Sequence, residues 1–358
     1  MNSDPTRPDA PIPIAVDAMS GDHGHEVAVD AALSCLASQP RLVLTLVGDE
    51  VALKSTLSAR APAAELRARL HVHHASEVVG MDESPAKALR SKKDSSMRVA
   101  VNLVKAGTVR AAVSAGNTGA LMATAKFVLK TLPGIDRPAI LAAIPAANGH
   151  THVLDLGANA ECSAEQLFQF AVMGSVLANV VHGLERPRVG LLNIGSEEIK
   201  GNEAVRQAAA LIAATDINYQ GFIEGDGIFL GDCDVVVCDG FTGNVALKTT
   251  EGAARLIRNF MREEFERNWF TKAAGLASLL VLKALGKRLD PRQYNGASFV
   301  GLNGIVIKSH GGADVVAFAN AIRVAALEAE KDVPNRIAQM LAHELNVRAE
   351  QGEVPPAA

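Results

Sequence analysis

The stretch VGLLNIGSEEIKGN (residues 189–202) begins with an apolar run typical of a buried strand and ends in a segment containing glycine and asparagine. The same pattern occurs in VSAGNTGAL (113–121), VLDLGANAE (153–161) and VVVCDGFTGN (235–244). Each glycine lets backbone N–H groups turn toward a ligand, which suits an anion. Such loops at the carboxyl ends of parallel strands meet in one crevice. We expect the four loops to converge there; the alternative is that they only form turns.

Strands and helices alternate outward from these loops. Strands are predicted at 12–17, 42–47, 111–114, 153–156, 189–194 and 235–238, and helices at 27–38, 119–130, 164–181, 203–214, 245–266, 315–330 and 334–346. This order predicts a three-layer α/β/α fold with a mostly parallel sheet, in a single large domain over residues 12–346. The proline-containing ends, 1–11 and 347–358, are expected to be flexible tails.

Composition narrows the classes of function. The 358 residues are 48% hydrophobic and 21% charged, which excludes disorder for most of the chain. Only 4% are aromatic and the net charge is −4, so no nucleic-acid partner is expected. The four cysteines lack C-x-x-C spacing and are interpreted as buried, reduced thiols. The N-terminus lacks an apolar signal region, and a cytoplasmic location is expected.

The segment WFTKAAGLASLLVLKALGKRL (269–289) breaks the pattern because it is too apolar for a solvated helix. Its longest apolar run, 273–282, is too short to span a bilayer, and Gly275 and Gly286 are expected to divide it into short helices. A helix lying on a membrane, a dimer interface and a core helix all remain possible explanations. We therefore predict a membrane or dimer contact at approximately 266–290.

The loop NIGSEEIKGN (193–202) carries Lys200 just before a predicted helix, where a lysine and free N–H groups together suit phosphate. The residues expected to surround the phosphate are Asn193, Gly195, Ser196 and Asn202. The alternative is an exposed lysine that pairs with a neighbouring glutamate.

The loop SAGNTGA (114–120) carries no charged side chain. Its Asn117 amide and its N–H groups suit an anion or a developing oxyanion. The other candidate substrate-binding residues in this loop are Ser114, Gly116, Thr118 and Gly119.

DLGAN (155–159) and DGFTGN (239–244) complete the set of loops. Their candidate substrate-binding residues are Asp155, Asn159, Asp239, Thr242, Gly243 and Asn244. Asp239 could orient a ligand or Lys200, although a helix cap is the interpretation we favour.

No metal or cofactor is predicted. DAMSGDHGH (17–25) holds two carboxylates and two histidines, but the pair His23 and His25 is more typical of a loop than of a metal site. The histidines of HVHH (71–74) are expected to face solvent, and GDGIFLG (225–231) lacks the glycine spacing of a dinucleotide site.

Seven segments, in order along the chain, carry a resemblance to one family. They are IAVDAMSGDHG (14–24), SAGNTGALM (114–122), GIDRPA (134–139), DLGAN (155–159), VGLLNIGSEEIKGN (189–202), VVVCDGFTGNVALKT (235–249) and YNGASFVGLNGIVIKSHG (294–311). The chain resembles the PlsX-type phosphate acyltransferases, which make acyl phosphate from acyl-acyl carrier protein and inorganic phosphate. His310, in the last segment, joins the candidate substrate-binding residues on this ground. Ser20, Ile199 and the pair Gly312-Ala313 depart from the family's usual residues.

The resemblance implies an isocitrate dehydrogenase-like fold related to phosphotransacetylases, a homodimer, and no required metal or nicotinamide. It also implies a role in bacterial phospholipid synthesis, in which acyl phosphate passes to a membrane-embedded glycerol-3-phosphate acyltransferase of the PlsY type. Peripheral association with an anionic surface at the inner face of the cell membrane, through the region around 269–289, is implied as well.

These expectations combine into a mechanism. Lys200 and Asn193 are expected to hold phosphate while Asn117 stabilises the oxyanion, so positioning and charge stabilisation dominate. Arg90, Lys92 and Lys93 form the best basic cluster for an acidic carrier protein, unless they are only a solvated loop. The rival functions are a metal- and NAD-dependent hydroxy-acid dehydrogenase of the same fold, a phosphotransacetylase-like enzyme, and a non-catalytic membrane-recruitment protein.

Overall fold

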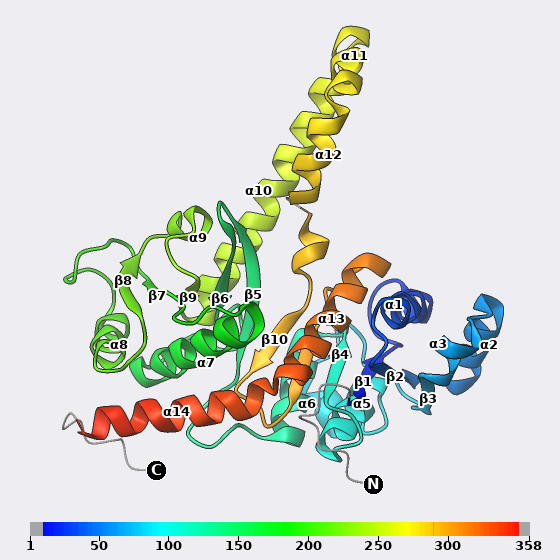
Figure 1. The fold of residues 1–358 in the computed structure, drawn as a ribbon, viewed down its shortest axis with the longest axis horizontal. Helices are drawn as coiled ribbons and strands as arrows, with labels where there is room; N and C mark the ends of the chain where they lie inside the picture. The colour runs from blue at the N-terminus through cyan, green and yellow to red at the C-terminus, as the bar shows by residue number, and fades with distance from the viewer. Residues whose placement is uncertain (1–9, 289, 351–358) are drawn as a thin grey trace.

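An 11-stranded sheet runs through the molecule in the order β3-β2-β1-β4-β11-β10-β5-β6-β9-β7-β8, and helices cover it (Figure 1). The structure is a computed structural model that describes residues 10–288 and 290–350. The strands are β1 (Ile12–Asp17), β2 (Leu42–Gly48), β3 (Leu70–His74), β4 (Ala111–Ser114), β5 (Ala139–Ala146), β6 (Gly149–Leu154), β7 (Val189–Leu192), β8 (Tyr219–Ile223), β9 (Val235–Val237), β10 (Ala297–Val300) and β11 (Ile305–Lys308).

The helices between these strands are α1 (Gly24–Ser38), α2 (Glu50–Arg60), α3 (Ala64–Ala68), α4 (Pro85–Ser91), α5 (Ser96–Lys105), α6 (Thr118–Leu129), α7 (Ala164–His182), α8 (Glu203–Ala213), α9 (Gly227–Leu230), α10 (Gly240–Glu266), α11 (Trp269–Ala277), α12 (Leu279–Arg288), the short 3-10 helix η1 (Pro291–Tyr294), α13 (Val315–Lys331) and α14 (Val333–Glu350). The predicted α/β class with a mostly parallel sheet is confirmed.

Strand direction reverses halfway across the sheet. β1, β2, β3, β4 and β11 are parallel to one another, whereas β10 is antiparallel to both β11 and β5. β6 is antiparallel to β5, and β9, β7 and β8 continue in the direction of β6. The loops that follow β6, β9 and β7 therefore leave the sheet at the opposite strand end from the loop that follows β4. The expectation that the four loops all follow strands of one direction is wrong for this reason, and their convergence on one crevice stays a prediction.

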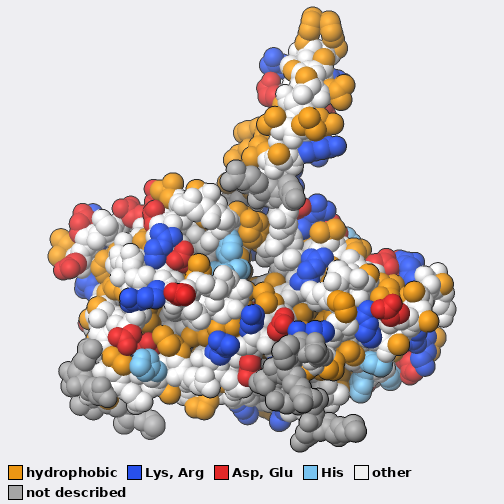
Figure 2. All heavy atoms as spheres, viewed as in Figure 1, with side chains coloured by type: hydrophobic (Ala, Val, Ile, Leu, Met, Phe, Trp, Pro, Cys, Tyr) orange, Lys and Arg blue, Asp and Glu red, His pale blue; other side chains and the backbone are white. Residues whose placement is uncertain are grey.

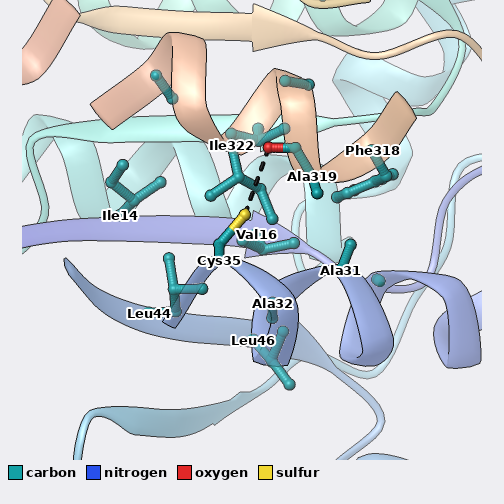
Figure 3. Close-up of a cluster of buried hydrophobic side chains, with 14 of the residues drawn as sticks. Ile14, Val16, Ala31, Ala32, Cys35, Leu44, Leu46, Phe318, Ala319 and Ile322 are labelled. Atoms are coloured by element: carbon teal, nitrogen blue, oxygen red, sulfur yellow. Dashed lines mark hydrogen bonds between the residues drawn. The ribbon is translucent and has the colours of Figure 1, made fainter. Parts of the chain in front are cut away.

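The sheet is buried on both faces. Along β1, Ile14 and Val16 pack against α1 and α13, whereas Ala15 between them belongs to the core on the other face. Figure 3 shows the first of these cores, where the Cys35 thiol donates a hydrogen bond to the Ala319 carbonyl at 3.3 Å. All four cysteines are free, and three of them are buried. Alternation across a fully covered sheet explains why the strands read as continuous apolar runs.

An arm projects from this body, formed by the outer part of α10 together with α11 and α12 (Figure 1). Figure 2 shows hydrophobic side chains along it, and Leu276 and Leu280 are 74% and 82% exposed. The two apolar helices meet at Ser278, the C-cap of α11, whereas Gly275 and Gly286 lie inside helices, so the expected division at those glycines is wrong. Gly275 instead lets α11 lie against Phe265 of α10.

The C-terminal helix α14 is longer than predicted. It continues to Glu350, so the predicted C-terminal tail begins as a helix; residues 1–9 and 351–358 lie outside the described residues. Within the described residues, one continuous helix, α7, is long and apolar enough to cross a bilayer. Because 72% of the most apolar 18-residue stretch of α7 is buried inside the protein, we interpret α7 as a core helix.

Candidate functional site

Three polar residues lie side by side where three neighbouring parallel strands end. Asp17 of β1 is the register partner of Ser114 of β4, and Ser114 is the register partner of Lys308 of β11. Each ends its strand and is followed by a glycine-containing loop. We call Asp17, Ser114 and Lys308 the strand-end cluster. Ligands bind at the carboxyl ends of parallel strands in open α/β sheets, so this cluster has the expected location of a site.

Hydrogen bonds fix the first two members of the cluster. The Ser114 Oγ donates to Asp17 Oδ2 at 2.6 Å, and the Ser20 Oγ donates to the same oxygen at 2.5 Å. The Gly116 N–H donates to the Ser114 Oγ at 3.1 Å. Asp17 is fully buried and Ser114 is 2% exposed, so this network holds the loops after β1 and β4 in one arrangement.

The N-terminus of α6 adds donors beside the cluster. Asn117 is its N-cap: Oδ1 accepts from the Ala120 N–H at 2.8 Å, and Nδ2 donates to the Met81 carbonyl at 2.6 Å. The Asn117 amide is thus held by the protein at both ends. The N–H groups at Thr118 and Gly119 belong to the first helical turn, which has no intrahelical acceptors, and both residues are exposed. These N–H groups suit an anion better than the asparagine amide does.

Lys308 is the cation of the strand-end cluster, and the sequence analysis did not predict it as a site residue. Burial lowers the pKa of Lys308 to about 8; Asp22 and Asp17 raise it, and Lys248 of α10 lowers it further. The ammonium donates to the Ser309 carbonyl. A signal did exist: GIVIKSHGG (304–312) is a fifth apolar run ending in polar and glycine residues. A half-buried lysine with a depressed pKa is a frequent feature of functional sites.

His310 lies in the loop after β11, next to the cluster. Its backbone N–H donates to Asn295 Oδ1 at 2.9 Å, and its Nδ1 accepts from the Gly312 N–H at 3.1 Å. The ring is exposed. The Asp22 N–H donates to the Gly311 carbonyl at 2.9 Å, which joins this loop to the one after β1.

DLGAN and DGFTGN pack against each other at the other strand end. Asp155 is fully buried: Oδ1 accepts from the Ile140 and Ala158 N–H groups at 2.9 and 3.0 Å, and Oδ2 accepts from the Asn159 N–H at 2.7 Å. A Cβ at Gly243 would meet the Asp155 carbonyl oxygen at 1.9 Å, so only glycine allows this approach. Desolvation raises the pKa of Asp155, although hydrogen bonds from Ile140, Ala158 and Asn159 oppose the shift.

Further contacts hold DLGAN and DGFTGN in one fixed arrangement. Asn159 Nδ2 donates to the Pro138 carbonyl at 2.9 Å, and Asn244 lies against Gly157. Asp239 Oδ1 caps α10 by accepting from the Thr242 N–H at 2.8 Å, which confirms the cap interpretation.

The Lys200 loop follows β7, beside β9. Lys200 Nζ lies 3.1 Å from Glu197 Oε1, with the two side chains 45% and 57% exposed. Asn193 Nδ2 donates to the Lys200 carbonyl at 3.1 Å, and Asn202 caps α8 through the Val205 N–H at 2.9 Å. The lysine is thus paired with a neighbouring glutamate, the alternative named above. Its role in phosphate binding remains a prediction.

An open pocket of about 400 Å³ lies next to Ser196 of this loop. Its lining includes Glu224, Asp226 and Asp232. Acidic walls disfavour a bound phosphate through charge repulsion. The electrostatics of the molecule therefore favour the strand-end cluster over this pocket as an anion site.

The residues predicted from sequence thus fall into two groups. The first group belongs to the strand-end cluster or to the loops beside it: Ser114, Gly116, Asn117, Thr118, Gly119 and His310. The second group lies in the loops after β6, β9 and β7: Asp155, Asn159, Asn193, Gly195, Ser196, Lys200, Asn202, Asp239, Thr242, Gly243 and Asn244. α10 connects the two groups, because it begins in DGFTGN and brings Lys248 within electrostatic range of Lys308.

The basic residues Arg90, Lys92 and Lys93 lie at the end of α4, and Lys92 is its C-cap. Arg90 and Lys93 are exposed. α4 packs on α6, where Pro85 lies against Gly119. The contact with Gly119 is thus made by the first residue of α4, at the opposite end of the helix from Arg90 and Lys92.

The candidate metal ligands near β1 are not assembled. His25 Nε2 lies 3.0 Å from Thr56 Oγ1 of α2, and His23 is the exposed N-cap of α1. Asp17 accepts hydrogen bonds from the hydroxyls of Ser20 and Ser114. The arrangement around Asp17 is that of a hydrogen-bonded scaffold.

Comparison with known proteins gives consistent matches. The model of the family described as fatty acid synthesis protein matches residues 12–336. The phosphate acyltransferase of Methylococcus capsulatus is 60% identical over 328 residues, which cover 92% of this chain and 96% of the relative. That of Alkalilimnicola ehrlichii is 59% identical over 330 residues, with 92% and 96% covered. Among solved structures, the EutD phosphotransacetylase from Staphylococcus aureus has a TM-score of 0.58 at 17% identity and covers 89% of this chain and 94% of that one, a likeness of fold.

Proposed function

The chain belongs to the fatty acid synthesis protein family, with relatives named phosphate acyltransferase, and on that premise we propose that it transfers a fatty acyl group from acyl-acyl carrier protein to inorganic phosphate. The product is an acyl phosphate for phospholipid synthesis. This function is favoured over the dehydrogenase of the same fold, because the similarity to phosphate acyltransferases extends over nearly the whole chain.

The reaction requires positioning more than acid–base chemistry. A phosphate oxygen attacks the thioester carbonyl, a tetrahedral oxyanion forms, and the C–S bond breaks to release the carrier thiolate. Inorganic phosphate is a mixture of monoanion and dianion near neutral pH, so a nucleophilic dianion is present without a strong base. The protein must hold two anions together, the phosphate and the developing oxyanion, and this requires cations and N–H donors.

The observation that carries the proposal for the site is the row formed by Asp17, Ser114 and Lys308 beside the N-terminus of α6. Lys308 supplies a positive charge that is partly shielded from water. Charge interactions are stronger there than in bulk water. The first-turn N–H groups of α6 supply donors for an oxyanion or a phosphate oxygen. Asp17 and Ser114 position this loop, and Asn117 caps its helix.

Lys200 remains a second candidate for phosphate. Its loop has the glycines and the helix start that a phosphate site needs, and phosphate would have to replace Glu197 as the partner of Lys200. DLGAN and DGFTGN would then act as the wall between the two loops, with Asn159 and Asn244 in support.

We assign carrier-protein docking to the basic end of α4, formed by Arg90, Lys92 and Lys93. An acidic carrier protein would be attracted there, and α4 links this basic end to the N–H groups of α6 through Pro85, which lies against Gly119.

We assign membrane contact to the arm. Trp269, Phe270 and Leu280 are 69%, 65% and 82% exposed, which is unusual for large apolar side chains on a water-facing surface. Burial in the headgroup region of an anionic bilayer would remove this apolar area from water. Contact between the arms of two copies in a homodimer would achieve the same result. Peripheral attachment would bring the acyl phosphate close to a membrane acyltransferase that consumes it.

The deciding experiment is incubation with acyl-acyl carrier protein in the presence and absence of phosphate. Both acyl phosphate and free carrier thiol are measured. Acyl phosphate formed in equal amount to the thiol, only when phosphate is present, supports the transferase. Thiol release independent of phosphate would identify a thioesterase instead.

A further inference from the structure

Three histidine rings converge at the start of β6, away from the strand-end cluster. His150 and His152 are separated by one residue on β6, so they point to the same face of the strand, and His182 is the last residue of α7. His182 Nε2 lies 3.2 Å from His150 Nε2 and 3.1 Å from His152 Nε2. The ligand nitrogens of all three rings lie within 4.8 Å of one another. We call these residues the histidine triad.

Hydrogen bonds alone do not account for this arrangement. A neutral imidazole nitrogen either carries one proton or presents one lone pair, so it makes one good hydrogen bond in the ring plane. His182 Nε2 has two close nitrogen neighbours, so either two N–H donors share its one lone pair or its one N–H is shared by two acceptors.

The spacing matches the requirements of a bound cation. Zn–N bonds of about 2.0–2.1 Å at tetrahedral angles place two ligand nitrogens about 3.3 Å apart. Two of the three separations in the triad, 3.1 and 3.2 Å, are within 0.2 Å of that value, and all three ligand atoms lie within 4.8 Å of one another. Three neutral imidazoles are the ligand set that zinc and neighbouring first-row divalent ions prefer.

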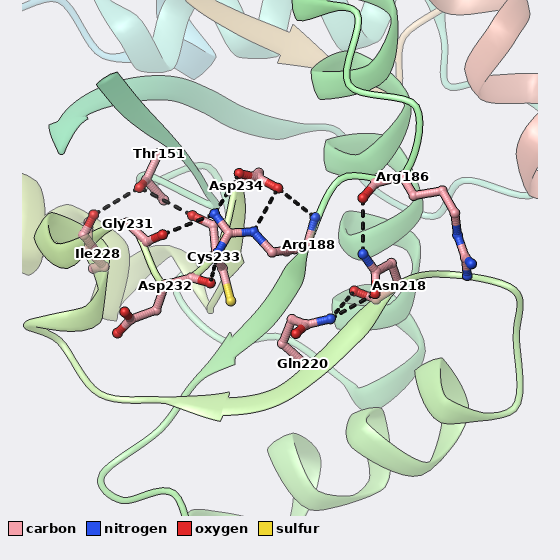
Figure 4. Close-up of polar contacts among 10 residues, drawn as sticks. All are labelled: Thr151, Arg186, Arg188, Asn218, Gln220, Ile228, Gly231, Asp232, Cys233 and Asp234. Atoms are coloured by element: carbon pink, nitrogen blue, oxygen red, sulfur yellow. Dashed lines mark hydrogen bonds and ion pairs between the residues drawn. The ribbon is translucent and has the colours of Figure 1, made fainter. Parts of the chain in front are cut away.

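The surroundings hold the ligands in place. The His152 backbone N–H donates to the Asp234 carbonyl at 2.9 Å. Figure 4 shows how Asp234 is fixed: Arg188 Nη2 donates to its Oδ1 at 2.9 Å, and the Arg188 N–H donates to its Oδ2 at 2.8 Å. Thr151, between the two strand histidines, donates to the Ile228 carbonyl at 2.9 Å on the opposite face. Fixed second neighbours of this kind orient metal ligands.

We propose that the histidine triad binds one divalent transition-metal ion of the zinc class through its three imidazole nitrogens, with a fourth position open to solvent. His152 is 3% exposed, and His182 is exposed at the surface, so the ion has a path of entry. The ion joins the end of α7 to the first residues of β6. It stabilises the fold and takes no part in acyl transfer.

The test uses untagged, chelator-treated full-length protein and Zn²⁺ as the titrant. Isothermal titration should give one Zn²⁺ per chain, and a hundredfold excess over Kd should raise the Tm by a few degrees. Titration with Co²⁺ should give the intense visible absorption of a four-coordinate site without a thiolate charge-transfer band. A thiolate band, or no stoichiometric binding, would overturn the proposal.

Matched variants assign the ligands. His182→Gln replaces an exposed ring and should leave the fold intact while it weakens Zn²⁺ binding at least tenfold. The control is the double variant His71→Gln and His73→Gln, which removes a pair of exposed strand histidines with the same spacing and should bind Zn²⁺ like the unmodified chain. Equal affinity in His182→Gln and in the control would show that the triad is not the site.

Discussion

Ser114 donates a hydrogen bond from its Oγ to Asp17 Oδ2 at 2.6 Å, across the two strands whose ends are register partners. Because Ser20 donates to the same oxygen, a single carboxyl oxygen holds two loops of the proposed site. The geometry of the site therefore depends on a side chain that is itself fully buried.

Asp17→Ala should destabilise the protein and impair activity together. It leaves two buried hydroxyls without their acceptor, at a cost of about 1–3 kcal/mol in the free energy of unfolding. Urea denaturation and kcat/KM report the two effects. Asp17→Asn is the control, since its amide oxygen can accept both bonds; equal losses in the two variants would contradict this role.

Lys308 should control the affinity for phosphate as a function of pH. The ammonium is charged below its pKa of about 8, so the KM for phosphate should rise as the pH increases through 8. Lys308→Arg should keep a low KM up to about pH 9, since arginine stays charged to above about pH 12. Lys308→Ala should have a KM raised at least tenfold and independent of pH.

Lys200→Ala serves as the comparison in the same assay. A large rise in the phosphate KM for Lys200→Ala, with Lys308→Ala unaffected, would move the phosphate site to the loop after β7. The reverse result would identify the strand-end cluster as the phosphate site.

Asp155→Asn should lower stability more than any change at a neighbouring cap. The amide nitrogen of asparagine cannot accept the N–H groups that the second carboxyl oxygen accepts, and the site is fully buried. The expected loss is about 1–3 kcal/mol in urea denaturation. Asp239→Asn keeps the cap of α10, because asparagine is an equally good N-cap, and should change stability by under about 0.5 kcal/mol.

Charge reversal at Lys92 and Lys93 should raise the KM for acyl-acyl carrier protein several-fold at low salt, with little change in the KM for phosphate. The effect should shrink as salt increases, because screening weakens charge attraction. Lys105→Glu with Lys331→Glu changes the net charge equally on other helices and is the control. An unchanged KM in the Lys92/Lys93 variant would exclude this docking surface.

The arm should bind anionic vesicles. Trp269 is the only tryptophan, so its fluorescence reports the arm directly, and a blue shift is expected on addition of vesicles. Leu280→Ser with Val281→Ser should reduce co-sedimentation by at least tenfold, since each buried side chain of this size contributes about 1.5–3 kcal/mol. Activity with soluble substrates should not change. Co-sedimentation unaffected by the two serines would assign the apolar surface to contact between protein copies.

The sequence was sufficient for the elements whose signals are local. Apolar runs predicted β1, β2 and β9, and the polar residue before α10, Asp239, was correctly interpreted as its cap. Asn117 and Asn202 were expected at a ligand, yet their side chains accept hydrogen bonds from helix N–H groups. A residue type suited to capping and to anion binding does not reveal which role it has until its neighbours are known.

The direction of each strand could not be predicted from sequence, because it depends on pairing between residues far apart in the chain. β10 lies between β11 and β5 and is antiparallel to both, and its four residues carry no local signal for that direction. The β5–β6 hairpin had only a weak local signal in Asn148, because Ala146 pairs with Gly149 and the two turn residues are Ala147 and Asn148. The histidine triad had none, because α7 brings His182 to β6 only through tertiary packing.

The position of β11 also has a consequence for synthesis of the chain. β11 pairs with β4, and α13 packs on α1, so segments near the C-terminus complete the half of the sheet that is translated first. While the ribosome makes the middle of the chain, β4 keeps an open edge that other nascent chains can pair with. A product that stops before residue 297 lacks β10, β11 and α13, and its N-terminal half should aggregate although every strand from β1 to β4 is present.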